Sequence, residues 1–105
     1  MAKALSKTQI KTDNAIANAL EDLSSRHGST LNGFQRFHHQ ANYTNFPASL
    51  MITCVYDSIV NAETAEAEQR ATIAKLIQAK LLKVGVRFKQ LDKQIMLDSE
   101  EACLN

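Results

Sequence analysis

The chain has 105 residues, of which 45% are hydrophobic and 22% are charged, and its formal net charge is +1. This length suits one domain with a single core, and the composition excludes a disordered chain. A net charge so near zero gives no general attraction to nucleic acid or membranes, so an electrostatic partner would have to meet a local patch. We expect a single domain over residues 1–105, with flexible ends at 1–6 and 99–105.

The sequence gives no sign of export or of a bound cofactor. No apolar run near the N-terminus is long enough for a signal peptide, and no stretch approaches the length of a membrane-spanning helix. There is also no glycine-rich phosphate loop and no metal-binding spacing of histidines. We therefore expect a cytoplasmic protein with no cofactor and no membrane partner.

The first predicted element is an amphipathic helix over residues 7–26. Ser6 is its expected N-cap, and Gln9 three residues later completes a capping-box pattern. Ile16, Leu20 and Leu23 recur at helical spacing and predict one buried face. Gly28 is expected to end the helix in the left-handed conformation.

Two strands follow. Residues 33–44 alternate between apolar and polar side chains, which predicts a half-buried strand, and residues 49–56 are apolar on both sides, which favours the centre of a sheet. The link at residues 45–48 is short enough for a hairpin. The two strands are therefore predicted to be antiparallel neighbours.

The second half of the chain predicts a helix and another hairpin. The helix covers residues 62–84, with Asn61 or Thr64 as its cap and Gly85 at its end. Residues 86–89 and 95–97 read as two short strands, followed by an acidic tail at residues 98–105. The predicted fold class is α+β in the order α-β-β-α-β-β, with two helices on one face of a small antiparallel sheet.

Histidine and carboxylate residues suggest one possible catalytic site. His39 shares the apolar side of its strand, where a hydrogen-bonded core histidine is the simpler interpretation. The sharper hypothesis joins His39 to Asp57, with Asp98 as a further carboxylate, in a metal-dependent hydrolase or nuclease. No catalytic motif accompanies these residues, so a protein without catalysis is favoured and the question of an enzyme stays open.

Charge is divided along the chain. Residues 37–69 contain four acidic residues and no lysine or arginine, whereas residues 70–93 contain seven basic residues and the single acid Asp92. The basic residues that we expect to bind a partner are Arg70, Lys80, Lys83, Arg87 and Lys89. Such a stretch is either a solvated helix face or a strip that contacts phosphates.

Phe46 precedes the only proline in a loop, and it either folds back over the sheet or stands exposed as a recognition residue.

We expect a small intracellular binding or regulatory module. Its partner would be nucleic acid at the basic strip or a protein at the uncovered face of the sheet. A homodimer formed through that face or an edge strand is also plausible.

The middle of the chain resembles a family of small uncharacterised proteobacterial proteins sometimes labelled Fis-type transcriptional regulators. The resemblance covers roughly residues 33–103. Its residues are Gly33-Phe34-Gln35, His39, Asn42-Tyr43, Phe46-Pro47, Ser49-Leu50, Ile52, Cys54-Val55-Tyr56-Asp57, Gly85, Asp98, Glu100, Glu101 and Cys103. It implies a fold and a lineage and supplies no activity. A Fis-like regulator has a helix-turn-helix near its end, where this sequence predicts a hairpin and a tail.

Overall fold

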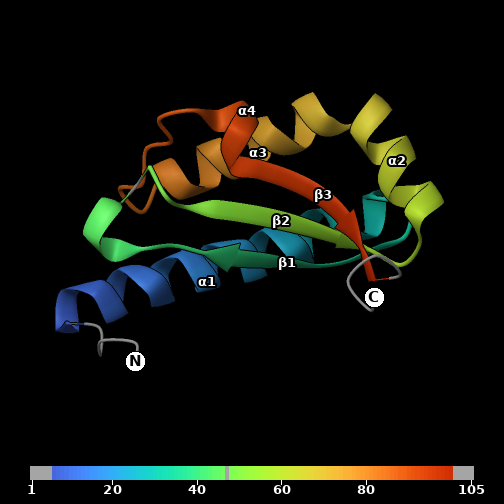
Figure 1. The fold of residues 1–105 in the computed structure, drawn as a ribbon. Coiled ribbons are helices and arrows are strands. Elements are labelled where there is room, and N and C mark those ends of the chain that lie inside the picture. The colour runs from blue at the N-terminus through green and yellow to red at the C-terminus, as the bar shows by residue number, and fades with distance from the viewer. Residues whose placement is uncertain (1–5, 47, 101–105) are drawn as a thin grey trace.

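The computed structural model describes residues 6–46 and 48–100. Its elements in chain order are α1 (Lys7–His27), η1 (Gly28–Thr30), β1 (Phe34–Gln40), η2 (Tyr43–Asn45), β2 (Met51–Tyr56), α2 (Ile59–Glu68), α3 (Arg70–Leu82), α4 (Leu91–Gln94) and β3 (Ile95–Ser99) (Figure 1). The three strands form one sheet in the order β1-β2-β3. No helix within these residues combines the length and the apolar character needed to cross a bilayer.

The start of α1 is as predicted, and its end is not. The Ser6 hydroxyl accepts from the backbone of Gln9, and the Gln9 side chain accepts from the backbone of Ser6, which completes the capping box. Gly28 has a φ of −57°, so the expected left-handed ending is wrong. The chain instead tightens into η1 and reverses direction at Gly33, where φ is +81°.

The second predicted helix is two helices that meet at Gln69, whose φ and ψ are −122° and −6°. The cap is Ser58 rather than Asn61 or Thr64, because the Ser58 hydroxyl accepts from the backbone N–H of Asn61. The bend lets α2 pack against β3 while α3 packs against α1. At the other end Gly85, with φ of +85°, closes α3 as predicted: its N–H donates to Leu82, and the next N–H donates to Leu81.

The predicted second hairpin is wrong, and so is an all-antiparallel sheet. Residues 86–89 form a connection rather than a strand, and β3 runs parallel to β2. The buried side chain of Gln94 holds the end of this connection. Its oxygen accepts from the backbone of Lys89 (3.0 Å) and Gln90 (2.8 Å), and its nitrogen donates to the carbonyl of Leu50 (2.9 Å). These backbone groups are therefore satisfied without a strand partner.

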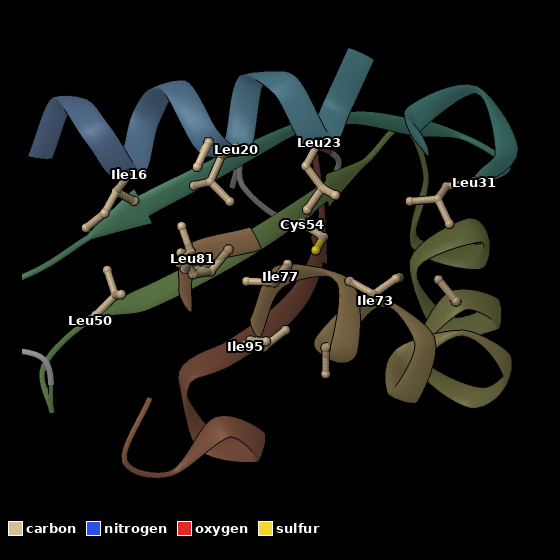
Figure 2. Packing of buried hydrophobic residues seen from close by; sticks show 14 of the residues in the cluster. Ile16, Leu20, Leu23, Leu31, Leu50, Cys54, Ile73, Ile77, Leu81 and Ile95 are labelled. Carbon is tan, nitrogen blue, oxygen red and sulfur yellow. The ribbon is translucent and has the colours of Figure 1, made fainter. Parts of the chain in front are cut away.

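The core lies on one side of the sheet. Ile52, Cys54 and Tyr56 of β2 point into it, and α1 and α3 cover it (Figure 2). The apolar face of α1 contributes Ile16, Leu20 and Leu23, and α3 contributes Ile73, Ile77 and Leu81. On the opposite face Val55, between its register partners Arg36 and Asp98, is 3% exposed, whereas Met96 is 47% exposed.

Neither predicted loose end extends as far as expected. Ser6 caps α1, and Ser99 is 1% exposed and pairs with Tyr56 at the end of β3. Residues 1–5 and 101–105 of the two predicted ends lie outside the described residues.

The turn before β1 leaves no room for a side chain at Gly33. A Cβ there would lie 2.4 Å from the Asn61 amide nitrogen and 2.6 Å from the Asp57 carboxylate. Asp57 and Asn61 are already hydrogen-bonded to each other (2.7 Å), and the Asp57 N–H donates to the Gly33 carbonyl (2.8 Å). This contact locks the start of β1 to the start of α2.

We predict that Gly33→Ala lowers the free energy of unfolding more than Gly85→Ala does. Both substitutions carry the left-handed strain of about 1–2 kcal/mol, but a Cβ at Gly85 meets no atom within 4 Å. The difference between the two variants in urea unfolding therefore isolates the clash at Gly33. Equal losses would show that Asp57 and Asn61 move aside at no cost.

Candidate functional site

Arg70 is a structural residue rather than part of an open binding strip. Its guanidinium pairs with Glu66 (2.8 Å) one turn earlier, and it also donates to the backbone carbonyls of Ile95 (2.6 Å) and Asp92. These bonds fasten the start of α3 to α4 and β3. The side chain is only 28% exposed.

Lys80 is also engaged within the fold. Its ammonium group pairs with the Asp22 carboxylate on α1, and Arg26 reaches the same oxygen from the next turn (3.0 Å). The hydrogen bond from Lys80, followed by that from Arg26, lowers the pKa of Asp22 below its ordinary value. Lys80 thus links α3 to α1.

The remaining predicted cations follow α3 in the chain. Lys83, Arg87 and Lys89 are exposed, as is Lys93 on α4. Within residues 6–46 and 48–100, no acidic side chain forms an ion pair with any of the four. We call these four residues the basic end, because the connection after α3 lies at the end of the molecule away from α2, with α4 nearer its middle (Figure 1).

The basic end rests on a fixed support. The Gln94 amide holds the backbone at Lys89 and Gln90 against the start of β2. Lys89 and Lys93 line a hollow of about 260 Å³ between α4 and the start of β2. Cations held in this way lose little backbone freedom when they meet a partner.

Phe46 folds back toward the core. Its ring stacks on that of Tyr43, with centroids 5.1 Å apart, and it packs against the core cluster. It is half-buried, so of the two sequence-based alternatives the structure has the inward one. The neighbouring Pro47 lies outside the described residues.

His39 and Asp57 are not brought together. His39 lies opposite Ile52 in the antiparallel pair, whereas Asp57 is bonded to Gly33 at the other end of β1. The six residue steps from Gly33 to His39 span about 20 Å of strand. Asp98 lies on β3 opposite Val55. The described part of the chain contains no group of three His, Cys, Asp or Glu side chains suited to a metal ion.

The partner of His39 is Asp13, which the sequence analysis did not single out. One carboxylate oxygen of Asp13 lies 2.9 Å from His39 Nε2 and accepts from the Tyr43 hydroxyl (2.8 Å). Asp13 precedes Ile16 by three residues and Leu20 by seven, so it stands on the apolar stripe of α1. A lone carboxylate on such a stripe is the signal that could have revealed it.

The Asp13 contacts shift the pKa of Asp13 and the pKa of Tyr43. The hydrogen bond to His39 lowers the pKa of Asp13, burial opposes this, and the Tyr43 hydroxyl adds to the lowering. Burial, then the bond to Asp13, raises the pKa of Tyr43. Beside His39, a hollow of about 200 Å³ between α1 and β1 is lined by Glu21, Ser24 and Arg36 among others.

The face of the sheet opposite the core, which we call the open face, carries polar side chains together with the apolar Met51, Val55 and Met96. His38, Thr53 and Met96 are register partners across the three strands, and Met96 is 47% exposed. Arg36 on the same face pairs with Glu100 beyond the end of β3. This is the surface predicted to meet a protein partner.

Comparison with known proteins adds no relative: no protein-family model, curated protein or solved structure matches the chain. The resemblance to the Fis-labelled family therefore stays a prediction.

We predict that Asp13→Asn destabilises the protein at neutral pH by about 1 kcal/mol, because it weakens two hydrogen bonds to a charged acceptor. The pKa of Asp13 is depressed in the folded state, so its contribution is present above its ordinary pKa of 3.8 and is lost as the pH falls through the lower folded value. The gap between wild type and variant should narrow on acidification. Urea unfolding from neutral pH to pH 3 measures it, with exposed Asp92→Asn as the control. A gap independent of pH would contradict this account.

Proposed function

We propose that this protein is a small intracellular binding module without catalysis of its own, and that the basic end contacts the phosphates of nucleic acid. The observation that carries this proposal is the state of its cations. Lys83, Arg87, Lys89 and Lys93 are exposed and form no ion pair with an acidic side chain in the part of the chain that the structure describes. Exposed, unpaired cations on a fixed backbone are suited to contacting phosphates.

The surface favours binding that does not depend on base sequence. All six aromatic side chains are buried or half-buried, so none forms an open platform for stacking bases. No helix projects from the basic end to read a groove, since α4 has only four residues. Phosphate contacts would then supply the affinity, and they carry no sequence information.

Neutralising Lys83, Arg87 and Lys89 together to Gln should abolish most of the binding to a labelled oligonucleotide. Removing three phosphate contacts should also reduce the salt dependence of log K by roughly three, since each contributes about 0.9. Fluorescence anisotropy with single- and double-stranded probes at several salt concentrations measures both effects.

The matched control neutralises Lys7, Lys11 and Lys75, which are also exposed and form no ion pair in the described chain. It changes the net charge equally and should retain most of the affinity. Lys80 is left out of the test set because its loss would leave Asp22 without its cross-helix partner. Unchanged binding in the first variant would refute the proposal.

A protein partner at the open face of the sheet is the second candidate. It is favoured by the half-exposed Met96, whose register partner on β2 is Thr53, on the face of the sheet opposite the core. One half-exposed apolar side chain is a modest signal. Binding at this face would be lost in Met96→Asp and would survive neutralisation of the basic end.

A further inference from the structure

The basic end also contains exposed apolar surface. Leu82 is 51% exposed and Val84 is 43% exposed. Beside them, a hollow of about 380 Å³ is lined by Gln78, Leu82, Val86, Arg87 and Phe88. A phosphate backbone would leave these apolar groups in water, so they point to a protein surface as a further partner.

The start of α2 presents the complementary surface. Val60 is 70% exposed and Ile59 is 44% exposed, the largest exposed apolar pair in the described chain outside the basic end. The exposed acid Glu63 lies one turn after Val60 on the same side of α2. The exposed Asp57 lies just before Ser58, the N-cap of the helix, and its carboxylate accepts from the Asn61 side chain. We call Asp57, Val60 and Glu63 the acidic end.

The two ends cannot meet within one molecule. α2 and the end of α3 lie at opposite ends of the fold (Figure 1), whose longest extent is 39 Å. Each end therefore presents an apolar centre with charges of one sign to the solvent. Neither end can therefore cover the other within the same molecule.

We propose that a second copy of this chain docks its acidic end onto the basic end of the first. Val60 enters the hollow beside Leu82 and Phe88, while Asp57 and Glu63 face Lys83 and Arg87. This contact is head-to-tail, so each bound copy keeps one end of each kind and further copies add as the concentration rises. It goes beyond the proposed nucleic-acid binding and does not depend on it.

The contact is weak and reversible. A small specific interface of about 1,200 Å² takes about 600 Å² from each copy, less than a tenth of the 6902 Å² surface. The exposed charges at its rim contribute orientation more than affinity. The apolar centre supplies most of the energy, so added salt weakens association without abolishing it.

The decisive experiment uses two variants, each with substitutions that disrupt the contact surface of one end and leave the other end intact. The first carries Leu82→Ser and Arg87→Glu, and the second carries Val60→Ser and Glu63→Lys. Each keeps one intact end and should be monomeric alone by sedimentation velocity from micromolar to millimolar concentration. Mixed together they should form a 1:1 dimer that cannot grow, because the first supplies the acidic end and the second the basic end.

Wild-type protein should show an average mass that rises with concentration. Val60→Ser alone should weaken this association by roughly tenfold or more, since burying a valine side chain contributes about 1.5 kcal/mol. Met96→Asp should associate as wild type does. All substituted side chains are exposed, and circular dichroism with urea unfolding verifies that each variant is folded.

Three results would overturn the proposal: a wild-type protein that stays monomeric throughout, a mixture of the two variants that forms no dimer, or association abolished by Met96→Asp and retained in the end variants. The last would place the contact between copies at the open face of the sheet. Oligonucleotide binding is measured separately, so its failure leaves this result intact, and the reverse also holds.

Discussion

The buried side chain of Gln94 joins the connection after α3 to the start of β2, and the second half of the fold is built around this link. A buried amide must find partners, and this one takes two backbone N–H groups of the connection after α3 and one carbonyl at the start of β2. The segment that could have paired as a strand is thereby held as a connection. The following residues turn through α4 and join β2 from its other side as the parallel strand β3. One polar side chain thus separates the observed mixed sheet from the predicted antiparallel one.

The crossover between β2 and β3 turns a division of charge along the sequence into a division in space. After β2 the chain passes through α2 at one end of the molecule and returns along α3 to the other (Figure 1). The start of α2 therefore lies far from the connection after α3 (Figure 1), whereas Glu66 near the end of α2 is linked through Arg70 to α4. Two parallel strands require such a long connection, whereas a hairpin would have kept the two stretches closer.

Local signals in the sequence predicted the elements that local physics determines. The capping box at Ser6, the apolar stripe of α1, the first pair of strands and the closing Gly85 are all present. The prediction of a second hairpin was wrong because residues 86–89 alternate between apolar and polar side chains. That alternation occurs in a strand and also in this connection, whose end is held by Gln94. The partner of His39 was missed because Asp13 is distant in sequence, and no spacing rule relates a helix carboxylate to a histidine on a later strand.

For the basic residues, too, the sequence could not show which side chains are paired within the fold. Sequence alone treats Arg70 and Lys83 alike, since both are cations on one stretch of chain. The packing of the fold distinguishes them. Arg70 and Lys80 lie against neighbouring elements, where they bind backbone carbonyls and carboxylates. Lys83 and Arg87 form no ion pair with an acidic side chain among the described residues, and exposed Leu82 and Val84 flank Lys83 in the chain. A cation that is already paired inside the fold adds little binding energy when a partner arrives. The cations without an ion pair therefore mark the surface where a partner would bind most favourably.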